Sequence, residues 1–453
     1  MKKFTLEEIA IACSGQFVGT DEQKNLCITS VERDSREIKD GSLFLAIKGE
    51  RVDGHDYIEK CYQSGAICAI CEKAPENTDK AYIIVDSTLE AVKKIAKAYR
   101  KKFDIPIIGV SGSVGKTSTK EMLYAVLSQK YKTHKTQGNL NNELGVPLTL
   151  LAMPEDTQTA VIEMGISDFG EMTRLSEMVC PTICVITVIG NCHLENLGDR
   201  DGVLKAKTEM FKFADKNAEF ILNGDDDKLF TVENVNGKKP IFYGFASDNA
   251  YYAENVENNG ESGVSCTLCF DDTRIDVTIP AIGNYMVSNA LAGVAVGKLL
   301  GLDDEQLKNG VEAFKTVGSR ANVINTGKIK IIDDCYNANP NSVKASLDTL
   351  VNFSGRKVAI LGDMKELGVE ELKLHFETGE YAKEKNIDLV LAVGPLAKEL
   401  ANGANGKWFA DIEQIKEALP TLIKEGDTVL VKASHSMQFE KITAYLSEQF
   451  TNK

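Results

Sequence analysis

The segment that decides the fold runs from Ile105 to Leu123 and reads Ile-Pro-Ile-Ile-Gly-Val-Ser-Gly-Ser-Val-Gly-Lys-Thr-Ser-Thr-Lys-Glu-Met-Leu. Its apolar start predicts a β-strand, and the glycines that follow let the backbone turn its N–H groups toward an anion. The residues after Gly115 predict a helix, whose N-terminus adds a partial positive charge. This order of strand, glycine-rich loop and helix is typical of a phosphate-binding loop.

The loop also carries the side chains that a nucleoside triphosphate site needs. Lys116 would reach the outer phosphates, and the Thr117 hydroxyl would bind Mg²⁺. The usual spacing places a glycine at position 110, where this chain has valine between Gly109 and Gly112. A Gly-Lys-Thr alone could be a solvated helix start, but the whole pattern favours nucleotide binding. The loop residues predicted to contact ATP are Gly112, Ser113, Val114, Gly115, Lys116, Thr117 and Ser118.

Length and charge narrow the class of protein. A chain of 453 residues is too long for one core, and ordinary domain sizes suggest about three domains. The net charge of −14 argues against a nucleic-acid partner, because such binding needs a basic surface. Glu7 and Glu8 interrupt the segment where a signal peptide would be apolar, and no apolar run is long enough to span a bilayer. We therefore expect a cytoplasmic protein without membrane insertion.

The cysteines predict free thiols. Eleven of them are spread over a long chain, and an odd number in this pattern is not a disulfide framework. Cys68 and Cys71, like Cys266 and Cys269, have the spacing of zinc ligands. Both pairs lie in apolar runs with a β pattern, far apart in the sequence, so core packing is favoured over zinc binding.

Three segments with alternating helix and strand patterns predict an α/β protein. Residues 1–103 form a small module, in which the donors of Asp34-Ser35-Arg36 suit a diphosphate or a uracil edge, with a plain turn as the alternative. Residues 104–316 predict a parallel sheet with ligands at the carboxyl ends of its strands. Residues 317–453 repeat the alternation and predict a smaller doubly wound domain.

Polar residues follow the predicted strands of the second segment. Glu163 ends one apolar run and His193 follows another. Either side chain could complete a Mg²⁺ shell, although a lone Glu or His is more often a turn residue, and the position after a strand favours function. Residues 136–147 form a loop rich in side-chain amides, with Asn139, Asn141 and Asn142 as candidate substrate contacts.

With these residues in view, the chain resembles the Mur ligases over nearly its whole length. The motifs that carry the resemblance are Gly112-Ser-Val-Gly-Lys-Thr-Ser-Thr-Lys-Glu, Thr136-Gln-Gly-Asn-Leu-Asn-Asn, Glu163-Met-Gly, His193-Leu-Glu, Ala206-Lys-Thr-Glu, Asp333-Asp-Cys-Tyr-Asn-Ala-Asn-Pro and Leu361-Gly-Asp-Met-Lys-Glu-Leu-Gly. The last two are the most specific. They look like the family members that add D-alanyl-D-alanine to UDP-N-acetylmuramoyl tripeptide.

The resemblance implies an ATP-dependent amide ligase with three domains. Residues 1–103 would bind the UDP-sugar, residues 104–316 ATP and metals, and residues 317–453, a Rossmann-like domain, the incoming dipeptide. The family phosphorylates the substrate carboxylate, and the dipeptide amine then attacks the acyl phosphate, passes through a tetrahedral intermediate and expels phosphate. The product would be the pentapeptide precursor of peptidoglycan, which connects the enzyme to cell-wall biogenesis, cell shape and cell division.

The resemblance also implies roles for single residues. Lys116, Glu163, His193 and Lys207 would be catalytic. Thr117 and Glu163 would hold one Mg²⁺ and His193 a second, while Lys207 would be carbamylated by CO₂ and present its carbamate to the metal. From the sequence alone, a solvated helix face is the favoured interpretation of Lys205 and Lys207. The further implied contacts are Asn289, Arg320 and Asp334 for ATP, Asn337 and Asn339 on a substrate loop, and Ser35, Arg36 and His55 for the UDP-sugar.

The chain departs from the family pattern at a few positions. Tyr285 stands where the family usually has histidine, Ala433 and His435 where it has glycine and arginine, and Cys192 where alanine is common. Replacing a guanidinium with an imidazole is not conservative. The changes at 433 and 435 bear on the amine site and not on the reaction class.

Two other interpretations stay open. One is a sibling enzyme, either another Mur ligase or a folate polyglutamate synthetase, and the loop that begins at Tyr336 argues against it. The other is a nucleotide-dependent switch protein, which would not need Glu163, His193 and Lys207 together. The sequence does not decide whether the third residue of the acceptor peptide is diaminopimelate or lysine. No coiled-coil heptads are present, so we expect a monomer.

Overall fold

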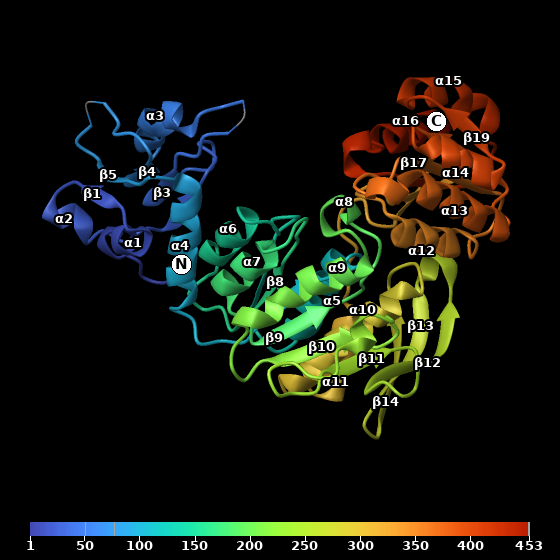
Figure 1. Ribbon diagram of the computed structural model, residues 1–453, viewed down its shortest axis with the longest axis horizontal. Helices are drawn as coiled ribbons and strands as arrows, with labels where there is room; N and C mark the ends of the chain where they lie inside the picture. The colour runs from blue at the N-terminus through green and yellow to red at the C-terminus, as the bar shows by residue number, and fades with distance from the viewer. Residues whose placement is uncertain (50, 77, 452–453) are drawn as a thin grey trace.

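The computed structural model describes residues 1–49, 51–76 and 78–451. Three β-sheets follow one another along the chain, each covered by helices (Figure 1). The first lies at one end of the molecule, drawn in blue, and the third, in orange and red, at the other. The predicted α/β class is confirmed.

The first sheet has five strands in the order β1-β5-β4-β3-β2. Strands β2 to β5 are parallel, and β1 is an antiparallel edge strand beside β5. Every residue of β3 and β4 is buried, as expected for parallel strands covered on both faces. The strands are β1 (Gln16–Val18), β2 (Ser30–Glu32), β3 (Ser42–Leu45), β4 (Cys68–Cys71) and β5 (Ala81–Ile84), and the helices are α1 (Leu6–Cys13), α2 (Asp21–Lys24), η1 (Gly54–Tyr57), α3 (Ile58–Gln63) and α4 (Thr88–Arg100).

Helix α4 joins the first sheet to the middle one. It packs on α1 and also on helices α6 (Gly145–Leu151) and α7 (Glu171–Val179). The buried Arg100 guanidinium donates hydrogen bonds to the carbonyls of Val179 at 2.8 Å and Cys180 at 3.2 Å. The hydroxyl of Tyr99 donates to the carbonyl of Met153 at 2.9 Å. These buried bonds attach the last helix of the N-terminal segment to the middle sheet.

The middle sheet has nine strands in the order β14-β13-β12-β11-β10-β9-β6-β8-β7. The strand order reverses at β6, which pairs with β8 on one side and β9 on the other. Ligands of open α/β sheets bind at such a reversal. The strands are β6 (Ile107–Ser111), β7 (Thr133–Lys135), β8 (Thr159–Glu163), β9 (Ile183–Ile186), β10 (Glu219–Asn223), β11 (Ile241–Gly244), β12 (Tyr251–Asn258), β13 (Val264–Phe270) and β14 (Thr273–Ile279).

Helices pack on both faces of the middle sheet. On one face Ile108 and Val110 of β6 share a core with α5 and α10, and on the other Ile107 belongs to the cluster that includes α4, α6 and α7. The remaining helices of this part are α5 (Lys116–Leu127), α8 (Leu194–Leu197), α9 (Arg200–Thr208), η2 (Glu209–Phe213), η3 (Leu229–Thr231), η4 (Gly260–Ser262), α10 (Tyr285–Leu299) and α11 (Asp304–Glu312).

The middle sheet is parallel from β7 to β12, as predicted, and continues at one edge with antiparallel strands that were not predicted from the sequence. Strands β12, β13 and β14 are antiparallel to one another. Only Asp271 and Asp272 separate β13 from β14, and a two-residue connection permits only an antiparallel pair. Exposed and buried residues alternate from Arg274 to Ile279 in β14, which is typical of an antiparallel strand with one face in water.

The third sheet has six strands in the order β15-β16-β20-β17-β18-β19. All neighbours are parallel except β15, which is antiparallel to β16 at the edge. Its strands are β15 (Asn322–Asn325), β16 (Lys330–Asp333), β17 (Lys357–Gly362), β18 (Leu389–Val393), β19 (Lys407–Phe409) and β20 (Thr428–Lys432), and its helices are α12 (Pro340–Leu350), η5 (Gly368–Glu370), α13 (Glu371–Glu384), α14 (Ala397–Ala404), α15 (Ile412–Leu422), η6 (His435–Met437) and α16 (Glu440–Phe450).

The cysteine pairs serve as core residues. Cys68 and Cys71 lie in β4 of the first sheet, Cys266 and Cys269 in β13 of the middle sheet, and all four thiols are buried and free. Within the described ranges, no group of three or more His, Cys, Asp or Glu is placed to hold a metal ion. The predicted core packing of both pairs is what the structure shows. Among the residues that the structure describes, no helix has the length and apolar character needed to cross a membrane.

Candidate active site

The phosphate-binding loop has the predicted geometry. Strand β6 ends at Ser111 and helix α5 begins at Lys116. Gly112 has a φ of 145°, and a Cβ there would lie 1.9 Å from the Thr187 hydroxyl oxygen, so only glycine fits. Gly115 caps α5 with a φ of 86°. Because it has no side chain, the first N–H groups of α5 are left for an anion.

The loop that follows β9 fixes the phosphate-binding loop from the side. The Ser113 N–H donates to the carbonyl of Val188 at 2.7 Å. The Ser113 hydroxyl oxygen accepts from the Gly190 N–H at 2.9 Å and from the Cys192 thiol at 3.0 Å. Cys192, one of the departures from the family pattern, therefore contributes a hydrogen bond to this anchor.

Two of the predicted Mg²⁺ ligands lie together. The Thr117 hydroxyl is 3.0 Å from both carboxylate oxygens of Glu163, and the Asn141 side-chain amide donates to Oε1 at 2.8 Å. Glu163 is 1% exposed and Thr117 4%. Adjacent hydroxyl and carboxylate oxygens fit Mg²⁺, which takes one or two protein oxygens and keeps other positions for phosphate and water.

Two lysines, one half-buried and one fully buried, flank this point. The Lys116 amino group donates to the carbonyl of Gly112 at 2.7 Å. Although the Lys116 side chain keeps some solvent contact, its amino group is enclosed by protein, and this burial, with the nearby charge of Lys207, lowers its pKa to about 8. Lys207 on α9 is 1% exposed, and burial lowers its pKa as well. Among the described residues no carboxylate pairs with it, whereas Lys205 is exposed over the ring of Phe169.

The third sheet supplies a second group of polar residues. Asp334 accepts from the Lys432 ammonium at 2.5 Å and from the Ser346 hydroxyl at 2.6 Å. The Arg320 guanidinium lies 3.7 Å from the centre of the Tyr336 ring. The Lys432 ammonium also donates to the carbonyl of Asn337 at 3.1 Å.

A cavity of about 780 Å³ brings these groups together. Its walls come from the phosphate-binding loop, the amide-rich loop, the ends of β8 and β9, the start of α10 and the loops of the third sheet. The predicted residues that line it are Ser113, Val114, Gly115, Lys116, Thr117, Ser118, Asn139, Asn141, Asn142, Glu163, His193, Asn289, Arg320, Asp334, Asn337 and Asn339. Tyr285 also lines it, and burial raises the pKa of its phenol. Lys207 is not among the lining residues.

Comparison with known proteins assigns the family. Three family models match in order: "Mur ligase family, catalytic domain" at residues 27–106, "Mur ligase middle domain" at 110–297 and "Mur ligase, glutamate ligase domain" at 319–435. UDP-N-acetylmuramoyl-tripeptide–D-alanyl-D-alanine ligase of Bacillus subtilis is 35% identical over 99% of both chains, and its Escherichia coli counterpart is 33% identical over 100% of both. The chain belongs to the Mur ligase family.

Solved structures agree with this assignment. A crystal structure of MurF from Acinetobacter baumannii superposes on this Mur ligase with a TM-score of 0.90 at 30% identity, over 99% of both chains. MurF from Thermotoga maritima, in complex with ADP, gives 0.81 at 29% identity over 93% of this chain and 97% of that one. A Mycobacterium tuberculosis folylpolyglutamate synthase gives 0.64 at 14% identity over 79% of this chain and 94% of its own, and therefore shares only the fold.

The residues predicted to bind the UDP-sugar lie apart from the cavity in this Mur ligase. Arg36 pairs with Asp34 at 2.6 Å and holds the pKa of that carboxyl well below its usual range. The two ring nitrogens of His55 contact protein groups: Nδ1 lies 2.6 Å from Asp53 Oδ1, and Nε2 accepts from the Glu72 N–H at 2.8 Å. His55 therefore braces the first sheet, and its role toward UDP, like that of Ser35 and Arg36, stays a prediction.

Several site residues of this Mur ligase were not predicted, among them Lys432 and Ser346 beside Asp334, and also Lys120 and Glu366. Lys120 lies within 4 Å of Glu163, and Glu366 lies against His193. Both occur inside motifs quoted above, but only Lys120 had a usable signal: it follows Lys116 by one helical turn and therefore shares its side of α5. Glu366 comes from a different sheet, so the sequence around it gives no indication of its partner.

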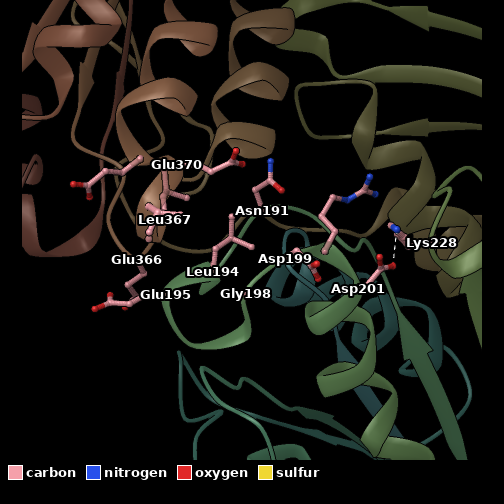
Figure 2. A pocket seen from close by; sticks show the side chains of 14 residues that line it. Asn191, Leu194, Glu195, Gly198, Asp199, Asp201, Lys228, Glu366, Leu367 and Glu370 are labelled. Atoms are coloured by element: carbon pink, nitrogen blue, oxygen red, sulfur yellow. Dashed lines mark hydrogen bonds and ion pairs between the residues drawn. The ribbon is translucent and has the colours of Figure 1, made fainter.

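A second cavity, of about 1060 Å³, lies between the middle and third parts of this Mur ligase. Figure 2 shows Leu194, Asp199 and Asp201 on one side and Glu366, Leu367 and Glu370 on the other. Glu366 lines both this cavity and the first one, so its contact with His193 lies at the border between the two cavities. Further lining residues include Asn191, Glu195, Arg200 and Lys228.

Proposed function

We propose that this Mur ligase joins D-alanyl-D-alanine to UDP-N-acetylmuramoyl tripeptide, with conversion of ATP to ADP and phosphate. The observation that carries the proposal is the shared cavity. Its lining includes the phosphate-binding loop and Glu163 together with Arg320, Asp334 and Asn337 from the third part of the chain. The relatives that carry this ligase name, at 30–36% identity over at least 94% of the chain, support it.

The chemistry has two steps. A carboxylate is too poor an electrophile for an amine, so a carboxylate oxygen of the tripeptide first attacks the γ-phosphorus of ATP and ADP leaves. The amine nitrogen of the dipeptide then attacks the acyl carbon, the tetrahedral intermediate collapses, and inorganic phosphate leaves with the former carboxylate oxygen. The amine gives up a proton in this step. The product is a pentapeptide precursor of peptidoglycan, which places the enzyme in cell-wall biogenesis.

The residues of the middle sheet bind and orient the reacting groups. The N–H groups at the start of α5 and the Lys116 ammonium would hold the β- and γ-phosphates. The negative charge of a phosphate beside Lys116 would raise the pKa that burial lowers, and would keep the ammonium charged. Asn139, Asn141 and Asn142 line the same wall and offer amide donors to the acceptor carboxylate.

Mg²⁺, when bound, would neutralise negative charge on the transferring phosphoryl group. Thr117 and Glu163 fit one ion by the oxygen pair described above, and His193 would contribute to a second. Lys207 would act as a carbamate. Its burial favours the neutral amine, which is the form that reacts with CO₂, and no described carboxylate pairs with it to favour the ammonium instead.

The third sheet would complete the ATP site and hold the dipeptide. Arg320 and Asp334 line the same cavity as the phosphate-binding loop, and Asn337 and Asn339 of the same loop region line it too. The cytoplasmic location, the monomeric state and the domain limits at 103 and 316 stay predictions, and gel filtration with light scattering tests the second.

The test is phosphate release from ATP by the purified protein. We expect release only when both UDP-N-acetylmuramoyl tripeptide and D-alanyl-D-alanine are present, and tripeptides with diaminopimelate or lysine at the third position identify the acceptor. Joining of free amino acids in place of the dipeptide would show a sibling ligase. ATP binding without dipeptide-dependent release, with either tripeptide, would show a nucleotide-dependent switch.

A further inference from the structure

Lys120 is a charged residue in a place that lysine rarely occupies. It lies on α5 and is 0% exposed. Its ammonium is 3.1 Å from Glu121 Oε1 and 3.6 Å from Glu163 Oε2, and donates to the carbonyl of Gly138 at 3.3 Å. Lysine is almost never fully buried unless paired, because an unpaired buried charge is strongly unfavourable. Two carboxylates and a carbonyl supply that pairing here.

The contacts of Lys120 converge on the predicted metal ligand. Thr117 and Lys120 are three residues apart on α5, so both reach Glu163 from the same face of the helix. The Asn141 amide contacts the other side of the carboxylate, and comes from the loop whose Gly138 carbonyl accepts from Lys120. One ammonium therefore connects the helix, the carboxylate that ends β8, and the amide-rich loop.

The need to neutralise Glu121 does not explain why a lysine is buried at position 120. Glu121 has a second cation, since its Oε2 pairs with the ammonium of Lys135. For Glu163, in the part of the chain that the structure describes, Lys120 is the one cation within 4.0 Å. Loss of Lys120 leaves Glu121 paired, but leaves Glu163 with neutral donors alone. The contact of Lys120 that no other described cation replaces is therefore the one with Glu163.

We propose that Lys120 is a positioning residue of the ligase reaction: its ammonium fixes the Glu163 carboxylate beside Thr117 and ties the loop at 136–142 to the same point. This rests on the proposed function, because it presumes that Glu163 and Thr117 bind Mg²⁺ with a nucleotide. Groups that orient a metal ligand are worth about 10- to 100-fold in metal affinity. Lys120 does not touch the substrate, and acts through Glu163.

The test compares Lys120→Met with Lys135→Met by calorimetric titration of ADP at a series of Mg²⁺ concentrations. Lys135, on β7, is the matched control, because it pairs with Glu121 in the same cluster but makes no ion pair with Glu163 among the described residues. We expect Lys120→Met to raise the Mg²⁺ concentration at which ADP affinity reaches half of its maximum by about tenfold. The affinity for ADP measured without Mg²⁺, in the presence of EDTA, should stay unchanged. Lys135→Met should match the wild type. Equal shifts in the two variants would overturn the proposal.

A double variant keeps the test decisive if Lys120→Met does not fold. Lys120→Met with Glu121→Gln removes one charge of each sign, so the buried cluster stays balanced. We expect the double variant to keep the shifted Mg²⁺ dependence; a wild-type dependence would show that Lys120 only neutralises Glu121, and would overturn the proposal. The readout is ADP binding and not ligation. A wild-type protein that binds ADP with Mg²⁺ but fails to use the dipeptide would therefore refute the proposed function alone.

Discussion

Nδ1 of His193, which follows β9 in the middle sheet, lies 2.5 Å from Oε2 of Glu366, which follows β17 in the third sheet. Both residues have a left-handed backbone conformation, with φ of 52° and 65°. This conformation costs a residue other than glycine about 1 kcal/mol or more. The contact also lowers the pKa of Glu366. The Glu195 N–H adds a bond to the Glu366 carbonyl at 3.4 Å. Two strained residues from different sheets therefore hold the middle and third parts together at the border of the two cavities.

Glu366→Ala should loosen this arrangement of the two parts. The substitution removes the carboxylate that meets His193, and leaves the third sheet itself untouched. We expect a larger radius of gyration in small-angle X-ray scattering without nucleotide. Glu370→Ala is the control, because Glu370 lines the same cavity but pairs with Lys373 on its own side. An unchanged radius for Glu366→Ala would show that the contact does not hold the parts in place.

Lys207→Ala should abolish ligation, and short carboxylates such as formate or acetate should restore part of it. A small carboxylate can occupy the space of the lost side chain and supply the negative charge that a carbamate would provide. The measurement is phosphate release with both substrates, after circular dichroism has shown a folded variant. Lys205→Ala should behave as the wild type, because that neighbour is exposed. A folded, inactive Lys207→Ala without rescue would leave the carbamate role unsupported.

The pair Lys205 and Lys207 also shows where sequence interpretation succeeds and fails. The strand, loop and helix from Ile105 to Leu123 could be predicted because their signals are local. The functional placement of Glu163 followed from the rule that ligands bind at the carboxyl ends of parallel strands, whereas its pairing with Thr117 was implied by the family resemblance. For Lys207, by contrast, the residue pattern alone favours a solvated face, because a charged residue in a helix gives no sign that tertiary packing will bury it, and only the family resemblance implies a role for it. The contact of Glu366 with His193 depends on how two sheets approach each other, which no local pattern encodes.

Tyr336→Leu should weaken nucleotide binding. The Arg320 guanidinium lies over the Tyr336 ring at 3.7 Å, and a cation–π contact of this kind is worth about 0.5–2 kcal/mol, so the affinity for ADP should fall by a factor of about 2 to 30. Calorimetry with Mg²⁺ present measures it. Tyr336→Phe keeps the ring and should bind as the wild type. Equal losses in the two variants would assign the effect to the phenolic hydroxyl and not to the ring.

His375 on α13 braces the loop that carries Glu366. The side chain is 0% exposed. Its Nε2 accepts from the Met364 N–H at 2.9 Å, which requires an unprotonated nitrogen, and Nδ1 donates to the carbonyl of Glu371 at 2.6 Å. Burial is the main cause that lowers the His375 pKa below its ordinary value of 6.5. The folded state therefore disfavours a proton that the unfolded chain accepts.

The sign of the resulting pH dependence follows from linkage. Below a pH of about 6.5 the unfolded chain binds more protons at this position, so stability falls as the pH falls toward the lowered pKa of the folded protein. His375→Gln removes the titrating group, and we expect its Tm to drop less between pH 7 and pH 5 than that of the wild type, although it starts from a lower value at pH 7. Differential scanning calorimetry at both pH values measures the two drops. His134→Gln, at a half-buried histidine in the middle sheet, serves as the comparison for a different site. The same drop in the wild type and in His375→Gln would show that His375 does not set the acid sensitivity of the third sheet.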